Sequence, residues 1–497
     1  MASLKSLAKE TAIYGLSSIV GRFLNYLLVP LYTAKFSVES GGYGFVTNIY
    51  SYVALAMVLL TFGMETTFFR FSNKEEENPR DVLSTTLIAV GGVALTFILL
   101  VLTLLNPISS ALGYSEHPWY VGQMAICVAV DAFQAILFAY LRYQRRPIKF
   151  AALKMLFIVM NIGLNLLYFV AFPYLYSKNP DIIGTIYNPT IGVGYVFTLN
   201  LICTLFITIF FIPELRNVSW HFDRALMRRM LSYSWPILIL GIAGILNQTA
   251  DKILFPLISH DDNPYGELAI YGGCSKVAMI MAMITQAFRY AYEPFVFSKS
   301  KESDSRETYA KAMRYFVIFT LLAFLTVMAS IDILKFVIGR DYWSGLYVIP
   351  IVMAAEIMMG IYFNLSFWYK LTDRTIWGAY FSGIGCAALI AINIIFVPRY
   401  GFEACAWAGF CGYGIAMLLS YFVGQRYYPI NYPLKAIGGY ALLAIAIFIV
   451  YKYVTFENMW YNVAFRAVFV LIYIGIIVAV EKKNFIHRNV TKNAIAN

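Results

Sequence analysis

The chain has 497 residues, of which 60% are hydrophobic and 13% are charged, and its formal net charge is +11. Apolar runs of about 20 residues, the length that crosses a hydrocarbon core about 30 Å thick, recur along the whole sequence. This composition excludes a soluble globular protein, and the intervals between the runs are too short to hold a soluble catalytic domain.

Breaking the apolar runs at Pro, Gly, Asn and charge clusters predicts an all-α, polytopic membrane protein with fourteen transmembrane helices. The first run contains Arg22 and is too long for a cleaved signal peptide, so we expect it to remain as a helix. In chain order, the predicted helices cover residues 11–36, 43–68, 81–106, 119–142, 148–171, 190–212, 229–256, 268–292, 309–330, 346–370, 375–396, 403–423, 434–453 and 460–480.

The distribution of Lys and Arg predicts the orientation of these helices. An even number of spans places both termini on one side, and the basic residues are concentrated in the termini and in the loops on that side, such as "RYQRRPIK" (142–149) and "RALMRR" (224–229). Because positively charged short loops stay in the cytoplasm, both termini are predicted to be cytoplasmic. The net positive charge is mostly an orientation signal, so we do not expect nucleic-acid binding.

An internal repeat relates the two halves of the chain. Segment 43–71 aligns with segment 271–299, which places Glu65 over Glu293, and the preceding helices show a second, proline-marked match. A repeat that begins after six predicted helices keeps the same orientation in the membrane. Its two copies are therefore expected to be related by a pseudo-twofold axis along the membrane normal, with a ligand site between them.

The repeat predicts two six-helix lobes in parallel arrangement and an addition. The N-lobe would cover residues 1–213 (helices 1–6), and the C-lobe residues 214–424 (helices 7–12). Two extra C-terminal helices and a cytoplasmic tail would occupy residues 425–497. This organisation is typical of secondary transporters.

The sequence contains no pattern that indicates catalysis or a bound cofactor. The four histidines are scattered without metal-ligand spacing, and no G-x-x-x-x-G-K-[ST] loop is present to drive ATP hydrolysis. We therefore expect a protein that is not an enzyme, with no cofactor and no metal site.

Charged residues inside the predicted spans are the candidate functional residues. On the insertion scale each costs about 2.5–3.5 kcal/mol, so such groups normally face a bundle interior or a wet cavity. Cationic groups at several depths suit an anionic headgroup, and arginine can bind phosphate oxygens through two parallel hydrogen bonds. The candidate substrate-binding residues of a cationic cavity are Arg22, Asn25, Lys154, Lys252, Lys276 and Arg289.

Some of these charges have a structural explanation that competes with the functional one. Arg22 favours a functional role, because it lies in the middle of its span and no acid shares its helix. Glu65 is expected to anchor a helix end or to pair with the nearby Arg70. Asp131 and Lys154 could neutralise each other between neighbouring helices, or each could serve the cavity.

A transporter without an ATP-binding motif must draw on an ion gradient or on consumption of its product. An ion shifts the equilibrium between two access states only through a difference in its affinity for them, which calls for a membrane carboxylate. Glu356 is the first candidate, because no basic residue lies within one turn on its own helix, and Asp251, next to Lys252, is the second. Asp131 is the third candidate for ion coupling.

Three segments resemble a known family. They are "LKSLAKETAIYGLSSIVGRFLNYLLVPLYT" (4–33), "YGFVTNIYSYVALAMVLLTFGMETTFFRF" (43–71) and "QAFRYAYEPFVF" (286–297). Their sequences are similar to those of Wzx-type oligosaccharide flippases, the polysaccharide transporter family of the MOP (multidrug, oligosaccharidyl-lipid and polysaccharide exporter) superfamily. The similarity is strongest to lipopolysaccharide-biosynthesis flippases. The resemblance implies a V-shaped fold that alternates between inward-open and outward-open states.

The resemblance also implies a substrate and a location. The substrate would be an undecaprenyl-pyrophosphate-linked oligosaccharide, such as an O-antigen repeat unit, moved from the inner to the outer leaflet of the bacterial cytoplasmic (inner) membrane. H+ or Na+ would be the coupling ion, and membrane lipids and the polysaccharide polymerase machinery would be partners. Arg22 matches the family's habit of placing cations in the cavity.

Three alternatives stay open at this point. A lipid II flippase would have a similar cationic cavity. A MATE-type drug or cation antiporter would favour a carboxylate on the first helix, and the sequence has none there. A polyprenyl-linked glycan polymerase would need a large outer loop with catalytic groups, whereas the longest outer loop, around residues 173–189, has Asp181 as its one acid.

Overall fold

The computed structural model describes residues 24, 26–216, 218–299, 305–372 and 374–496, and within them it contains helices and no β-strand. The α-helices are α2 (Leu28–Lys35), α3 (Gly42–Thr61), α4 (Met64–Ser72), α5 (Pro79–Thr103), α6 (Leu105–Ala111), α7 (Pro118–Tyr143), α8 (Pro147–Leu166), α9 (Phe172–Lys178), α10 (Pro180–Ile183), α11 (Gly194–Ile209), α12 (Ile212–Arg216), α13 (Arg224–Ile258), α14 (Pro264–Lys299), α15 (Ser305–Ala329), α16 (Ile331–Leu334), α17 (Ile349–Leu365), α18 (Phe367–Leu371), α19 (Ile376–Tyr400), α20 (Phe402–Tyr427), α21 (Leu434–Tyr453) and α22 (Met459–Ala496). The π-helix η1 (Leu167–Ala171) and the 3-10 helices η2 (Pro189–Ile191), η3 (Lys335–Val337) and η4 (Arg340–Val348) complete the set.

Twelve helical segments in the described part of the chain are long and apolar enough to cross a membrane. They correspond to twelve of the predicted spans. The predicted span 190–212 appears as the shorter apolar helix α11, which begins only after a 3-10 turn and Gly192, whose φ of 51° interrupts the helix. The predicted span 11–36 lies mainly outside the described residues, so the count of fourteen stays a prediction.

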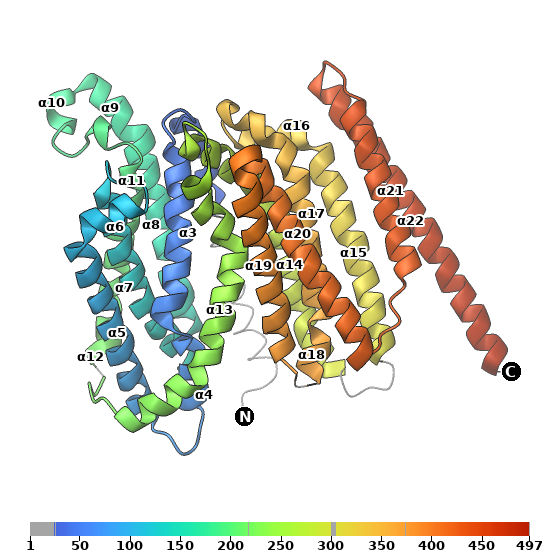
Figure 1. Cartoon of the computed structure of the whole chain (residues 1–497), viewed down its shortest axis with the longest axis horizontal. Helices are drawn as coiled ribbons and strands as arrows, with labels where there is room; N and C mark the ends of the chain where they lie inside the picture. The colour runs from blue at the N-terminus through green and yellow to red at the C-terminus, as the bar shows by residue number, and fades with distance from the viewer. Residues whose placement is uncertain (1–23, 25, 217, 300–304, 373, 497) are drawn as a thin grey trace. The chain divides into compact units, whose positions relative to one another are not determined.

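The chain divides into two compact units (Figure 1). Unit 1 comprises Met1–Gly273 and Leu389–Cys405, and unit 2 comprises Cys274–Ala388 and Ala406–Asn497. In unit 1, α7 packs against α3, α5 and α11, and α3 also packs against α13. In unit 2, α15 packs against α17, α21 and α22. The units are defined by contacts and the predicted lobes by a sequence repeat, so the lobes stay a prediction.

A sharp turn separates α3 from α4 inside one predicted span. Phe62 and Gly63 both have left-handed backbone conformations, with φ of 49° and 67°. A Cβ atom on Gly63 would lie 2.9 Å from a methyl group of Ile237, so glycine serves both the conformation and the close approach. After this turn, Glu65 forms an ion pair with Arg142 of α7 at 3.1 Å. Of the two alternatives for Glu65, the pair with Arg70 is wrong, because Arg70 lies over the ring of Tyr233, whereas Glu65 does lie in the first turn of α4.

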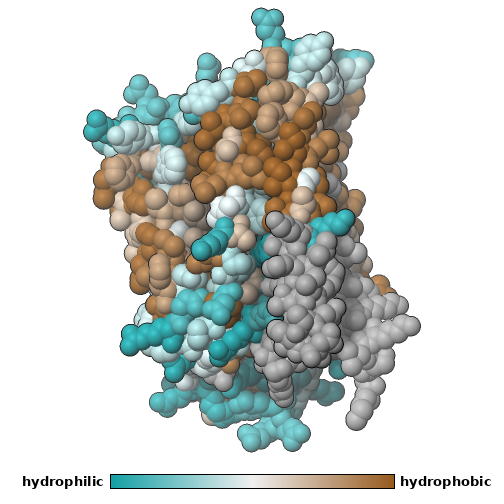
Figure 2. All heavy atoms as spheres, turned by 90° about the vertical axis from the view of Figure 1, so that its right-hand side faces the viewer, coloured by the Kyte–Doolittle hydropathy of each residue, from teal (hydrophilic) through white to brown (hydrophobic). Residues whose placement is uncertain are grey.

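The surface of unit 2 carries the apolar side chains that a membrane protein exposes to lipid. Figure 2 shows a broad hydrophobic area on one face, with hydrophilic residues gathered toward its ends. Large apolar side chains on α21 and α22 are strongly exposed, among them Leu442 and Leu471. An apolar surface of this size is typical of a region that contacts lipid and not water. The described chain is a multi-pass membrane protein.

Candidate functional site

The predicted site residues fall into two groups. Arg22 and Asn25 lie outside the described residues. The other seven all lie in membrane-spanning segments. Unit 1 contains Asp131 (α7), Lys154 (α8), Asp251 and Lys252 (α13), and unit 2 contains Lys276 and Arg289 (α14) and Glu356 (α17).

Asp131 is held by neutral hydrogen-bond donors. The hydroxyl group of Thr204 on α11 donates to Asp131 Oδ1 at 3.1 Å. The thiol of Cys127, one turn earlier on α7, contacts Asp131 Oδ2 at 3.8 Å. Positions i and i+4 share one face of a helix, so the Cys127 thiol reaches the carboxylate along α7, whereas Thr204 reaches it from the neighbouring helix α11. In the described part of the chain, the Asp131 carboxylate has no ion-pair partner.

The hydrogen bonds continue from Asp131 to a third helix. Cys127 Sγ lies 3.2 Å from Asn200 Oδ1 and 3.4 Å from Thr204 Oγ1. The Asn200 amide then donates to the Tyr50 hydroxyl on α3 at 2.5 Å. A linked set of polar groups therefore connects α7, α11 and α3.

Lys154 lies near this network without joining it. Its ammonium group is 4.0 Å from the ring centre of Phe138 and interacts electrostatically with Asp131 and Glu65. Within the residues that the structure describes, Lys154 and Asp131 form no direct ion pair. The two charges attract each other without forming a direct ion pair, so both alternatives for this pair stay open.

Asp251 and Lys252 form an ion pair with each other. Lys252 Nζ contacts the two carboxylate oxygens of Asp251 at 3.0 and 2.9 Å, and the Tyr271 hydroxyl donates to Asp251 at 2.7 Å. The backbone of Lys252 is fixed in turn, because Asn48 donates to its carbonyl oxygen at 2.7 Å. The two charges largely cancel, which leaves this pair less suited to binding an anion or carrying an ion.

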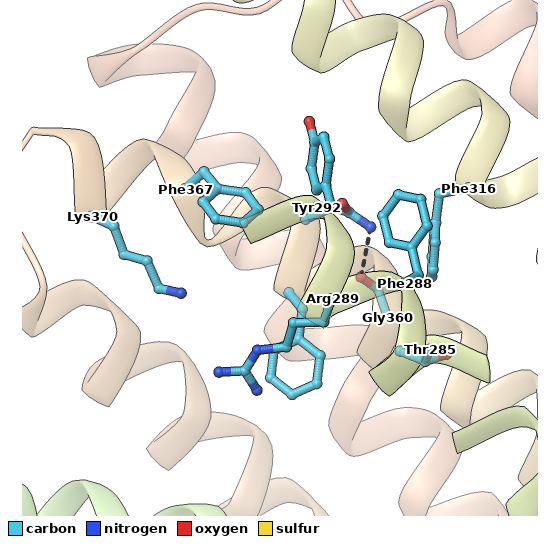
Figure 3. Close-up of a pocket in the computed structure, with 10 residues that line it drawn as sticks. Thr285, Phe288, Arg289, Tyr292, Phe316, Gly360, Phe367 and Lys370 are labelled. Carbon is cyan, nitrogen blue, oxygen red and sulfur yellow. Dashed lines mark hydrogen bonds between the residues drawn. The ribbon is translucent and has the colours of Figure 1, made fainter. Parts of the chain in front are cut away.

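Unit 2 contains a pocket with two cations among aromatic rings (Figure 3). The guanidinium group of Arg289 lies 4.6 Å from the ring centre of Phe363, and the ammonium group of Lys370 lies 5.1 Å from that of Phe367. Figure 3 shows both cationic groups extending from different helices toward the same open space. The cavity itself has a volume of about 10 Å³, room for about one water molecule, and is lined by Thr285, Phe288, Arg289, Tyr292, Phe316, Gly360, Phe363, Asn364, Phe367 and Lys370.

Helical periodicity explains why these residues meet. Residues 285, 288, 289 and 292 follow the spacing i, i+3, i+4, i+7 and form one face of α14. Residues 360, 363 and 364 of α17 and 367 at the start of α18 repeat this spacing. Gly360 allows α17 to approach both neighbours, since a Cβ atom there would lie 2.8 Å from Thr285 of α14 and 2.4 Å from the ring of Phe316 of α15. The Thr285 hydroxyl is buried and has no hydrogen-bond partner within the described structure.

The structure adds residues that the sequence analysis missed and places others apart. Lys370 was passed over because it ends a predicted span, where a lysine is typical of a membrane anchor. The matching aromatic spacing in 285–292 and 360–367 was the signal that could have found it. Lys276 and Glu356 are half-buried on their helices and do not line the pocket.

A family model described as "Polysaccharide biosynthesis protein" matches residues 7–297, which is more than half of the chain. The chain belongs to the polysaccharide biosynthesis protein family. No curated protein matches it closely enough to add to this assignment. The predicted resemblance to a polysaccharide transporter family is thus confirmed at the level of the family.

Solved structures of MOP-type transporters share the fold of this polysaccharide biosynthesis protein. The lipid II flippase MurJ in an inward closed conformation has a TM-score of 0.73 and 16% sequence identity, covering 95% of this chain and 99% of that chain. An inward-facing MATE multidrug resistance transporter of the MOP superfamily has a TM-score of 0.61 and 12% identity, covering 84% and 97%. The MATE multidrug transporter DinF-BH has a TM-score of 0.58 and 16% identity, covering 86% and 96%. At these identities the likeness concerns the fold.

Proposed function

We propose that the protein is a secondary transporter that flips undecaprenyl-pyrophosphate-linked oligosaccharide units from the cytoplasmic to the periplasmic leaflet of the bacterial inner membrane. Transport proceeds by alternating access of the two predicted lobes and is driven by a proton or sodium gradient. The observation that carries this proposal is the pocket in which Arg289 and Lys370 lie among aromatic rings, in a chain of the polysaccharide biosynthesis family.

The chemistry of the pocket matches a sugar pyrophosphate. Arginine offers a planar set of N–H donors that fits phosphate oxygens, and lysine adds a compact positive charge. Both cations lie in a membrane-spanning segment, where electrostatic attraction to an anion is stronger than in water. Aromatic rings supply flat apolar faces beside the polar groups, as binding pockets for organic ligands commonly do.

The same pocket disfavours transport of cationic drugs. An organic cation would need a carboxylate or an unopposed aromatic surface, whereas the described residues that line this pocket include two cations and no acid. Lipid II also carries a polyprenyl pyrophosphate, so the pocket suits it equally well. The family assignment favours a polysaccharide precursor, and the experiment below separates the two substrates.

Transport in reconstituted vesicles tests the proposal. A fluorescent undecaprenyl-pyrophosphate disaccharide and fluorescent lipid II are placed in separate vesicle samples, and a membrane-impermeant quencher reports which leaflet each occupies. We expect the protein to accelerate flipping of the disaccharide lipid more than that of lipid II. The double variant R289A/K370A should abolish this acceleration, because the pyrophosphate loses both cationic partners.

A matched control is available in the same unit. Arg374 lies 4.3 Å from the ring centre of Tyr427, so it is also a cation on an aromatic ring, but it does not line the pocket. R374A should flip the disaccharide lipid at the wild-type rate. Wild-type flipping by R289A/K370A would contradict the pocket assignment, and equal or faster flipping of lipid II would transfer the proposal to that substrate.

A further inference from the structure

The polar network around Asp131 has a property that the Asp251 site lacks. Its donors are a hydroxyl and a thiol, and both groups can donate or accept a hydrogen bond. A carboxylate held by a lysine would lose its ion pair on protonation and leave the lysine charge buried and unopposed. In the described part of the chain Asp131 has no cation in direct contact; Lys154 attracts it at longer range and is also attracted to Glu65, which opposes the lysine charge when Asp131 is protonated.

We propose that Asp131, Thr204, Cys127 and Asn200 form a reversible hydrogen-bond chain that binds and releases one proton, and that Asp131 is the coupling carboxylate of the transporter. The coupling role rests on the proposed function, whereas the proton site does not. This hydrogen-bond chain lies in unit 1 and joins α7 to α11.

The atoms balance in both protonation states. In the ionised state, Thr204 donates to Asp131 Oδ1, and Cys127 donates to Asp131 or to Asn200. When a proton binds to Oδ1, the new hydroxyl donates to Thr204 Oγ1. Thr204 then donates to Cys127, across a 3.4 Å contact in which either atom can be the donor, and Cys127 donates to Asn200 Oδ1. Existing hydrogens only reorient, and the charge of the site changes from −1 to 0.

The surroundings give this change an effect on packing. Lys154 on α8 is attracted to ionised Asp131 on α7, and this attraction disappears when Asp131 is protonated. Protonation therefore weakens the contact between α7 and α8. A conformation in which this contact is looser binds the proton more tightly, and this difference in affinity lets the proton shift the conformational equilibrium. The titratable or charged groups that interact with Asp131, Cys127 or Lys154 in the described structure are Arg142 on α7, Tyr50 on α3, Cys203 on α11 and Glu65 on α4.

The ligand atoms favour a proton over Na+. Hard cations are bound by several oxygen atoms. Here the sulfur of Cys127 contacts both the Asp131 carboxylate and the side-chain oxygen of Asn200. It therefore occupies the position that a cation bound by both oxygens would need. A thiol is a poor ligand for a hard cation but a usable link in a hydrogen-bond chain.

Infrared difference spectroscopy tests the proton site without any substrate. On acidification, the wild-type protein should gain a protonated-carboxyl C=O band that D131N lacks and that E356Q and D251N retain. T204V should shift this band, because the protonated carboxyl loses its hydrogen-bond acceptor. The matched control is T198V, which removes a different α7–α11 hydrogen bond, the one from Gln123 to Thr198 at 2.9 Å, and should leave the band unshifted. A complete band in D131N, or its loss in E356Q, would overturn the assignment.

A vesicle experiment tests the coupling role. One pH unit across the membrane changes the equilibrium ratio of substrate between the two leaflets about tenfold for each coupled proton. Wild-type flipping of the fluorescent disaccharide lipid should rise by up to about that factor, while D131N should flip at one rate with or without the gradient. A gradient response retained in D131N would refute coupling through Asp131. If the wild-type protein flips no sugar-lipid at all, the proposed function fails, and the infrared result still decides the proton site.

Discussion

The Asp131 network of unit 1 and the cationic pocket of unit 2 place charge in the membrane in two different ways. The negative charge of Asp131 is held by a hydroxyl and a thiol, which accept either protonation state. The positive charges of Arg289 and Lys370 lie against the faces of aromatic rings. A ring face favours a cation and offers nothing to which a proton could be passed.

This difference separates two tasks of a transporter. A group that changes its charge at little cost suits ion coupling, because the ion must bind and leave during each cycle. A guanidinium group keeps its charge under all physiological conditions and so offers a constant site for an anion. Asp251 belongs to neither type, because it forms an ion pair with Lys252. Four predictions test this distinction.

The largest expected effect is a difference in protein stability between variants of Asp251 and Asp131. D251N should lower the free energy of unfolding by about 3–5 kcal/mol, because it leaves the charge of Lys252, which is only 22% exposed, without its partner. D131N should lower it by about 1 kcal/mol, the loss of a hydrogen bond from a neutral donor. Thermal or denaturant unfolding in detergent measures both. Equal losses would remove the distinction between the two acids.

The second prediction concerns the shape of the cation in the pocket. R289K keeps the charge but cannot form two parallel hydrogen bonds to phosphate, so binding of undecaprenyl pyrophosphate should weaken by about 1.5–3 kcal/mol, roughly 10- to 150-fold in Kd. Titration calorimetry in detergent measures this change. R374K is the control outside the pocket and should bind as the wild type does. Unchanged affinity in R289K would mean that Arg289 acts through charge alone.

A smaller effect is expected from the ring beneath Arg289. F363L removes the aromatic face but keeps an apolar side chain, and it should weaken binding of the same probe by about 1 kcal/mol. Y427L removes the corresponding ring beneath Arg374 and should leave binding unchanged. If both variants bind equally well, the ring does not position the guanidinium group.

The smallest effect is expected outside the membrane, at Asp223. Its carboxylate caps α13 by accepting hydrogen bonds from the backbone N–H groups of Leu226 and Ala225, and these bonds lower the pKa of Asp223. A backbone N–H cannot accept a proton, so these donors favour only the ionised form, unlike those of Asp131. Because the pKa is lower in the folded state, the stabilisation is complete above the unfolded pKa of about 4 and is lost as the pH falls.

The variant D223N isolates this effect, because asparagine keeps an acceptor oxygen but does not titrate. The wild-type protein should be more stable than D223N near neutral pH, and the difference should vanish as the solution is acidified. Unfolding measured at a series of pH values tests this expectation. A difference that grows on acidification would reverse the sign of the argument.

Local patterns in the sequence were sufficient to predict most of the membrane-spanning helices. Apolar runs placed the spans, because crossing a membrane requires about 20 consecutive apolar residues and this requirement is readable along the chain. The break at Phe62 and Gly63 was missed, since hydropathy does not register two residues with positive φ. Gly192, which shortens α11, was missed for the same reason.

The candidate sites were only partly readable. Asp131 and Arg289 stood out by themselves, because a charge inside an apolar run is conspicuous. Their partners did not, since Thr204 and Phe363 are unremarkable residues in membrane helices and gain a role only through the helix they face. Glu356 was ranked first because of the residue spacing on its own helix, and the variant E356Q now serves as a control in the test of Asp131.

The sequence by itself determined that this protein crosses the membrane many times, that it resembles polysaccharide transporters, and which charges lie within its spans. Each of these properties depends on the order of residues along one helix or on short motifs. Only the tertiary structure decided that Glu65 pairs with Arg142, that Lys370 shares a pocket with Arg289, and that Cys127 links Asp131 to Asn200. The physical reason is that these contacts form between helices, and helical periodicity fixes which face a residue occupies but not which neighbouring helix that face meets.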